Sequence, residues 1–196
     1  MNIVQFFENT LVNNPDKVFL KEEIEREEGY FYDSLTYLEF YRSYTKIASA
    51  LSQLDIGDGD RVAIILSNPI EIITVWFAVN LVGGTAVILE PILTHQERQK
   101  QLSHIEPKFV IDSLTLLSMR HEPSVGEIVY GLKENPISTI VYSSGTTGEP
   151  KGVLVAHKTY IMCGEAFPWW MGLREDDTLY TCLSLAHINA QAYSVM

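Results

Sequence analysis

Hydrophobic residues recur at helical spacing in the first quarter of the chain. They occupy positions 3, 6, 7 and 11 after a capping Asn2, and Pro15 ends the pattern, which predicts a short amphipathic helix on the surface. A longer run keeps a step of three or four residues from Tyr37 to Leu54. It predicts a second amphipathic helix that ends before Gly57.

Two strand-like stretches lie between these helices. They cover residues 18–21 and 30–35 and flank an acidic run at 22–29. Charges in a row are typical of a solvated turn, so the run predicts an exposed hairpin tip without a binding role.

From residue 61 onward, short apolar strands alternate with helical patterns. The strands are expected at 61–66, 85–89, 108–111 and 137–142, and the helices at 70–82 and 94–105. Residues 113–134 have weaker periodicity and predict a helix followed by a surface loop. Strands that are apolar on both sides and separated by helices form a parallel sheet. The fold class is therefore α/β, with a mostly parallel sheet and helices on both faces.

Residues 72–89 contain no charged side chain, and this length is near the lower limit for a membrane-spanning helix. Gly83 and Gly84 interrupt the stretch, and strand-forming residues follow them. We therefore interpret it as a buried helix that ends at glycine and leads into a core strand.

Charge and cysteine content narrow the possible functions. The formal net charge of −11, from 25 acidic and 14 basic residues, repels phosphate backbones and anionic membranes, which argues against a nucleic-acid partner. An anion site in such a chain must be built from backbone N–H groups and a few placed cations. Cys163 and Cys182 are too few for a disulfide framework, and the first residues carry no signal-peptide pattern. A cytoplasmic location is expected.

One polar loop has the composition of a phosphate site. It runs from Ser143 to Gly152, between the strand at 137–142 and a returning strand at 153–155. Its glycines let the backbone bend so that N–H groups point inward, its hydroxyls add donors, and Lys151 adds a cation. An ordinary exposed loop also uses Ser, Thr and Gly, but it has no need to pack them with a lysine between two apolar strands.

Two other phosphate motifs fail on spacing. A Walker A loop needs four residues between its glycines and a Ser or Thr after its lysine, whereas Gly145 and Gly148 are too close and Gly152 follows the lysine. A dinucleotide fingerprint would start at Gly57, but Val62 stands where its third glycine belongs.

The loop resembles the phosphate-loop signature of the adenylate-forming superfamily, which includes acyl-CoA synthetases, luciferases and peptide-synthetase adenylation domains. It agrees with Ser/Thr-Ser-Gly-Thr-Thr-Gly-x-Pro-Lys-Gly at every defined position. Other blocks resemble further family motifs in the same order, namely Leu35–Phe40, Gly59–Ala63, Leu81–Ala86 with Glu90–Pro91, and Leu183–Gln191. The last block departs from the family pattern at Ser184 and Ala186, where proline and an aromatic residue are usual.

The resemblance implies that a carboxylic acid and ATP give an acyl adenylate and pyrophosphate, after which coenzyme A takes the acyl group, with fatty acid metabolism as a possible setting. It implies catalytic roles for Thr146, Thr147, Lys151 and His187. The phosphates would be held by Ser143, Ser144, Gly145, Thr146, Thr147, Gly148 and Lys151. Mg²⁺ is expected to bridge the phosphates, but its usual carboxylate ligand lies beyond this chain, so no metal residue is assigned.

The resemblance also implies an acyl-substrate site at His187, Asn189 and Gln191, where the imidazole would lie near the bound carboxylate. A structural histidine at a strand end is the alternative. His157 is expected to start a helix and take no part in the chemistry. Trp169 and Trp170 are expected to be packing aromatics, although an acyl tunnel would use them equally.

Residues 1–196 are expected to form part of the large N-terminal domain of an adenylate-forming enzyme, because the family's later motifs are absent and the chain stops within a helical pattern. Such a fragment is expected to be inactive alone and to expose an apolar surface that favours self-association. Two alternatives remain, an adenylation domain that loads a carrier protein and a non-catalytic module that binds nucleotide or a partner.

Overall fold

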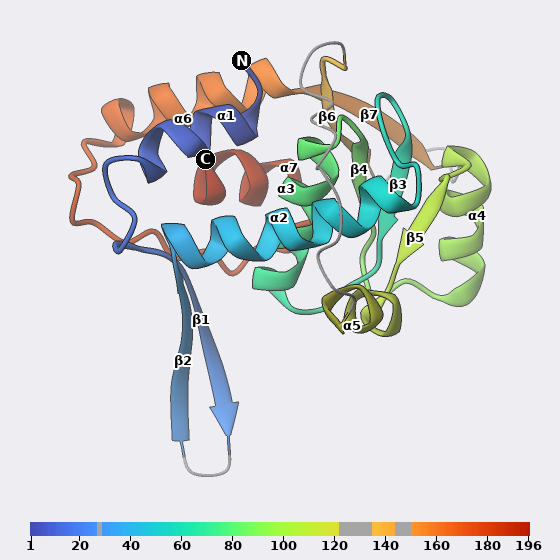
Figure 1. The fold of residues 1–196 in the computed structure, drawn as a ribbon, viewed down its shortest axis with the longest axis horizontal. Coiled ribbons are helices and arrows are strands. Elements are labelled where there is room, and N and C mark those ends of the chain that lie inside the picture. The colour runs from blue at the N-terminus through green and yellow to red at the C-terminus, as the bar shows by residue number, and fades with distance from the viewer. Residues whose placement is uncertain (27–28, 122–134, 144–149) are drawn as a thin grey trace.

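A five-stranded sheet in the order β5-β3-β4-β6-β7 organises the chain (Figure 1). In this computed structural model, residues 1–26, 29–121, 135–143 and 150–196 are described. The strands are β3 (Arg61–Ile64), β4 (Thr85–Ile88), β5 (Phe109–Ile111), β6 (Ile137–Ser143) and β7 (Lys151–Ala156). The first four in the sheet order are parallel, and β7 returns antiparallel to β6. The prediction of a mostly parallel sheet is confirmed.

Helices cover both faces of this sheet. Val62 and Ile64 of β3 join the larger core, and Ala63 between them joins a second core that includes Ile105. The second core lies under α4 (His95–Ile105). The other helices contribute to the larger core and are α1 (Ile3–Leu11), α2 (Tyr37–Gln53), α3 (Pro69–Leu81), α5 (Ser113–His121), α6 (His157–Met171), α7 (Ile188–Ala190) and the π-helical η1 (Gln191–Val195). Val62 and Ile64 face one core and Ala63 the other because successive side chains of a strand point to opposite faces of the sheet.

Helix α3 and strand β4 account for the uncharged stretch. Asn68 caps the helix by accepting a hydrogen bond from the Glu71 N–H at 2.9 Å, and Gly83 has a φ of 87° where the chain turns. A Cβ on Gly84 would lie 2.9 Å from Val79 Cγ1, so a larger residue has no room there. The predicted buried helix and core strand are confirmed. Within the described ranges, no helix is both long and apolar enough to span a bilayer.

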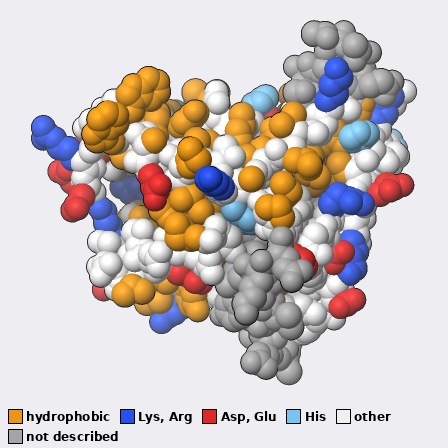
Figure 2. All heavy atoms as spheres, turned by 90° about the horizontal axis from the view of Figure 1, so that it is seen from above, with side chains coloured by type: hydrophobic (Ala, Val, Ile, Leu, Met, Phe, Trp, Pro, Cys, Tyr) orange, Lys and Arg blue, Asp and Glu red, His pale blue; other side chains and the backbone are white. Residues whose placement is uncertain are grey.

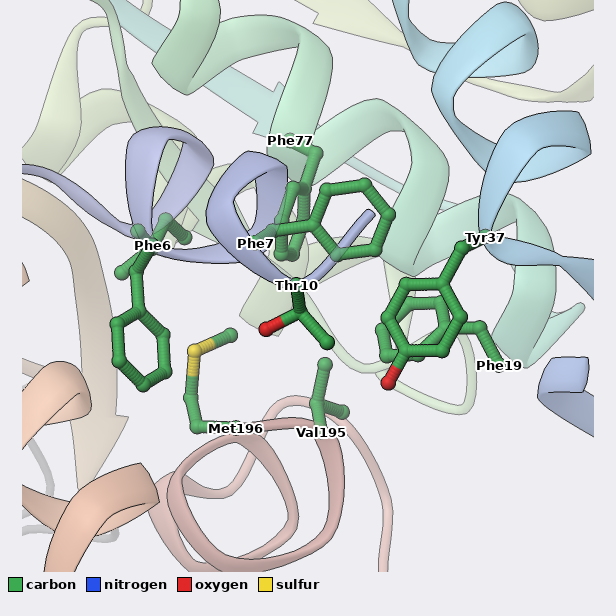
Figure 3. Close-up of a pocket in the computed structure, with 9 residues that line it drawn as sticks. Phe6, Phe7, Thr10, Phe19, Tyr37, Phe77, Val195 and Met196 are labelled. Atoms are coloured by element: carbon green, nitrogen blue, oxygen red, sulfur yellow. The ribbon is translucent and has the colours of Figure 1, made fainter. Parts of the chain in front are cut away.

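The N-terminal helix is amphipathic as predicted, and aromatic rings hold it in place. Its Phe7 stacks on Tyr37, with ring centroids 5.3 Å apart, and meets Phe77 edge-on at 5.6 Å. A cavity with about 50 Å³ of free space remains between α1 and the end of the chain, and Thr10 and Met196 line it (Figure 3). That space is enough for a water molecule or two and too small for an organic ligand.

The hairpin of β1 (Val18–Arg26) and β2 (Gly29–Thr36) projects from the rest of the chain (Figure 1). The prediction that residues 22–29 form its tip was wrong, because β1 continues through most of that run. Side-chain contacts between β1 and β2 stabilise this polar part of the hairpin. The Tyr32 hydroxyl donates to Glu23 at 2.9 Å, and the Lys21 ammonium lies 5.6 Å from the Tyr32 ring centroid.

The predicted helix and loop at 113–134 are described only in their first part. Helix α5 occupies Ser113–His121 and packs Leu116 and Met119 into the larger core. The expected surface loop, residues 122–134, lies outside the described residues.

Candidate functional site

Strands β6 and β7 hold the two ends of the predicted phosphate loop. Ser143 is the last residue of β6, Lys151 is the first residue of β7, and the two are partners in the antiparallel register. The middle of the loop lies outside the described residues, and with it the predicted phosphate-binding residues Ser144, Gly145, Thr146, Thr147 and Gly148.

The loop starts at the carboxyl edge of the parallel strands. Ala86 of β4 pairs with Thr139 of β6, and counting on from this pair brings Glu90 level with Ser143. In open α/β sheets, ligands bind outside the carboxyl ends of the strands. Both described ends of the predicted phosphate loop therefore lie at the edge where an α/β fold binds its ligands.

Lys151 is exposed at this edge. Among the residues that the structure describes, it makes no salt bridge. An exposed ammonium with no carboxylate partner in the described chain is available to an anionic ligand.

Gly152 is required by the crowding around it. A Cβ at this position would lie 2.8 Å from Ile140 Cγ2, closer than side-chain contacts allow. His104 of α4 and Tyr142 of β6 close the same space, with 2.8 Å between His104 Nδ1 and the Tyr142 hydroxyl. Burial raises the pKa of Tyr142 to about 12, so the hydroxyl stays protonated and joins α4 to the strand that carries the loop.

His187 lies directly before α7 and reaches the strand-end region next to β4. Its Nε2 is 3.8 Å from Glu90 Oε1, a distance that suits an ion pair when the imidazole is protonated. Its side chain is 65% exposed and makes no capping hydrogen bond to the helix. The exposed imidazole is accessible to a ligand at the carboxyl edge of the sheet, and its role as a substrate contact or as a structural histidine stays a prediction.

The other two predicted acyl-site residues point in different directions. Asn189 is exposed on α7. Gln191 is 1% exposed; its Nε2 donates to the Leu185 carbonyl at 2.6 Å, and its Oε1 accepts from the Tyr160 hydroxyl. The Gln191 amide is thus bonded within the core.

His157 starts α6 as predicted. It is buried, and its Nδ1 accepts a hydrogen bond from the Ile3 N–H at 3.4 Å. Burial lowers its pKa to about 4, so the imidazole is neutral near pH 7 and joins α6 to the start of α1.

The prediction that Trp169 and Trp170 are packing aromatics was wrong, and the alternative of an acyl tunnel stays a prediction. They are 85% and 75% exposed at the end of α6, close to the helix-ending Gly172. Sequence gives no sign of this, because an aromatic pair in a helix is usually buried.

Two contacts were not anticipated from sequence, that of His187 with Glu90 and that of Tyr160 with Gln191. Glu90 comes directly after an apolar strand, and this position indicates a residue at the edge of the sheet where ligands bind. Tyr160 is one polar aromatic in a helical pattern, and no local feature marks its bond to Gln191. In the described part of the chain, no group of three or more His, Cys, Asp or Glu side chains is placed to hold a metal ion, so no Mg²⁺ ligand is assigned.

Comparison with known proteins identifies the family of this chain. The family model described as AMP-binding enzyme matches residues 7–134 and 118–196. The chain belongs to the AMP-binding enzyme family. The 2-succinylbenzoate–CoA ligase of Bacillus cereus (ATCC 14579) is 28% identical over 186 residues, which cover 89% of this chain and 37% of that ligase. The ligase of Bacillus cytotoxicus is 27% identical over 188 residues, with the same coverage.

Solved structures of AMP-binding enzymes share the fold. O-succinylbenzoate coenzyme A synthetase of Bacillus subtilis, in complex with AMP, superposes with a TM-score of 0.81 at 24% identity, over 97% of this chain and 52% of that one. The N-terminal subdomain of NpsA from Klebsiella oxytoca, in complex with 3-hydroxyanthranilyl-AMSN, gives a TM-score of 0.80 at 22% identity, over 99% and 50%. The chain therefore spans about half of these solved chains and 37% of the ligases.

Proposed function

We propose that residues 1–196 are part of the N-terminal domain of an enzyme that uses ATP to convert a carboxylic acid into an acyl adenylate and then passes the acyl group to coenzyme A. The observation that carries the proposal is the register of Ser143 with Lys151 at the carboxyl edge of β6. It places both ends of a family-type phosphate loop where α/β folds bind ligands.

The chain's own part in the reaction is to grip the polyphosphate. A carboxylate oxygen attacks the α-phosphorus, the bond to the bridging oxygen breaks, and pyrophosphate leaves with its negative charge. Hydroxyls and N–H groups of the loop, with Thr146 and Thr147 at its centre, would donate to the β- and γ-phosphates. Lys151 would offset the charge that grows on the leaving pyrophosphate.

His187 would serve the carboxylate end of the same reaction. Its imidazole is exposed and is positioned next to Glu90 at the carboxyl end of β4. When protonated, the imidazole would be a donor for a substrate carboxylate or for the adenylate. Asn189, exposed two residues further on, would contact the acyl group.

Relatives support coenzyme A as the acceptor and leave the acid open. The Bacillus relatives are named as succinylbenzoate–CoA ligases, and one solved structure of the Bacillus subtilis synthetase holds a product analogue called OSB-NCoA. Another holds ATP and magnesium ion. These names point to an aromatic acid, and none of them supports the expected link to fatty acids. Ser184 and Ala186 depart from the family pattern near the acyl site, so we assign no particular acid.

A binding-only role is the second candidate, because the chain spans 37% of the length of the ligases that it matches. In that case it would bind ATP or pyrophosphate without turnover. Pyrophosphate release with a panel of carboxylates separates the two roles. We expect no sustained release from this chain by itself, and sustained release would overturn the view that it holds only part of the site.

The exposed apolar residues define a candidate contact surface. We use the name α6-β7 surface for the exposed apolar side chains of these two elements, each at least half exposed: Val153, Leu154, Met162, Trp169, Trp170 and Met171. Val153 and Leu154 follow each other on a strand and so point to its opposite faces. Hydrophobic side chains gather in clusters on the face along which α6 runs (Figure 2). Strand β7 is also an edge strand of the sheet, with an unpaired outer side among the described residues. We expect a second copy of the chain to cover this surface when the chain is purified alone.

A further inference from the structure

A chain of buried hydrogen bonds connects three elements behind the candidate site. Thr139 Oγ1 of β6 lies 2.6 Å from the Tyr160 hydroxyl of α6, and that hydroxyl donates to Gln191 Oε1 of η1. Gln191 Nε2 then donates to the Leu185 carbonyl at 2.6 Å. Thr139, Tyr160 and Gln191 are each no more than 1% exposed, so water does not compete for these bonds.

The last bond closes the turn that carries His187. The Gln191 amide spans from η1 back to Leu185, so residues 185–191 form a loop held at its base by one side chain. Two backbone bonds add to this closure: the His187 N–H donates to the Ser184 carbonyl at 3.0 Å, and the Gln191 N–H donates to the His187 carbonyl at 3.4 Å. The exposed His187 side chain has little packing of its own, so the backbone of this turn sets its position.

The other end of the hydrogen-bond chain is fixed on the strand that leads into the phosphate loop. Thr139 lies on β6, which ends at Ser143, and it pairs with Ala86 of β4. Strand β6 therefore leads directly into the phosphate loop and is also bonded, through Thr139, to the turn that carries His187. Gln191 also begins a π-helical turn, a rare geometry that is frequent at functional sites.

We propose that Gln191, acting through Tyr160 and Thr139, is a positioning residue that holds the His187 turn in register with the phosphate loop on β6. This rests on the proposed function for its purpose in the reaction, since the register matters when one ligand spans both places. The role differs from the acyl contact expected from sequence, because the amide of Gln191 is turned into the core.

The test follows the imidazole resonances of the purified chain by NMR. The sequence contains five histidines, and the His187 signal is assigned by its loss in His187→Gln. Gln191→Met keeps the side-chain length and removes both hydrogen bonds, and Tyr160→Phe removes the hydroxyl that joins α6 to Gln191. In both variants we expect the His187 signal to shift and broaden, while the His104 signal, on the α4 side of the sheet, stays in place. Tyr160→Phe serves alone if Gln191→Met does not fold.

A neighbouring polar network provides the matched control. Ser138 Oγ accepts from Trp76 Nε1 at 3.0 Å and donates to Asn80 Oδ1 at 2.6 Å, so these hydrogen bonds end on α3. This network meets the proposed chain through ring packing, with the Trp76 and Tyr160 centroids 5.1 Å apart. Ser138→Ala should lower the melting temperature without moving the His187 signal. Thr139→Ser should keep the wild-type signal, whereas Thr139→Val should resemble Tyr160→Phe.

The outcomes separate positioning from simple core packing. An unmoved His187 signal in folded Gln191→Met or Tyr160→Phe overturns the proposal, and so does an equal change in Ser138→Ala. The NMR signal and the melting temperature can both be measured without turnover. A failure of the proposed function would appear as an unchanged affinity for pyrophosphate when Lys151 is substituted, and it is therefore distinct from a failure of the positioning role.

Discussion

Lys151 lies directly across from Ser143 in the antiparallel pairing of β6 and β7, so the two strands clamp both ends of the phosphate loop. The pairing of the two strands thereby places the lysine, and in the described part of the chain its side chain makes no salt bridge. Its charge can be changed without loss of packing, which makes the functional proposal directly testable.

Removing the charge of Lys151 should weaken anion binding more than stability. We expect Lys151→Met to reduce the affinity for pyrophosphate at least about tenfold, because an unshielded ammonium at a phosphate site contributes on the order of 1–3 kcal/mol. Isothermal titration calorimetry measures the affinity, and thermal unfolding measures stability. Lys158→Met is the control, since Lys158 is exposed at the start of α6. Equal weakening by both variants would indicate a general charge effect.

Gly152 should tolerate no side chain. In Gly152→Ala the new Cβ would meet Ile140 Cγ2 at 2.8 Å, so β7 must shift against β6. Overpacking of this kind costs about 1–3 kcal/mol in the free energy of unfolding, which urea titration measures. Gly57→Ala is the matched control, because a Cβ there meets nothing within 4 Å and Gly57 is not among the glycines with positive φ. A neutral Gly152→Ala would show that the strand pair is looser than the structure indicates.

Acid should destabilise the fold through His157. In the unfolded chain a histidine titrates near about 6.5, whereas burial holds the folded pKa at about 4. Between these values the unfolded state binds more protons, so the free energy of unfolding falls as the pH drops. The full loss is on the order of 3 kcal/mol. Urea titrations at pH 7 and pH 5 should show a smaller decrease in His157→Leu than in the wild type. The exposed His121→Gln should leave the decrease unchanged.

Self-association should depend on the tryptophans of the α6-β7 surface. Trp169→Glu with Trp170→Lys places charges on its most exposed part, which should oppose burial against a second copy. Sedimentation velocity over a range of concentrations measures the effect, with a shift from dimer to monomer expected. Ile92→Glu is the control, because Ile92 is 85% exposed but lies outside α6 and β7. A monomeric wild type would refute the prediction.

Local patterns predicted most helices and the core strands. Helix α2 ends one residue before the predicted position, α3 begins at Pro69 after its Asn68 cap, and α6 begins at His157. These boundaries follow from capping residues and hydrophobic periodicity, which act over a few residues. Both hairpin strands were predicted, but the continuation of β1 through residues 22–26 was missed, since its stability comes from pairs across strands, such as Tyr32 with Glu23.

The sequence by itself determined the α/β class and the composition of the phosphate loop, because both depend on neighbours along the chain. Gly152 belongs to that loop signature, and the structure added a steric reason for glycine there, because a Cβ would collide with Ile140. Only the tertiary structure decided the strand order, the meeting of His187 with Glu90, and the turn of Gln191 into the core. Those relationships join residues far apart in sequence, and their energies depend on packing and burial that no local propensity encodes.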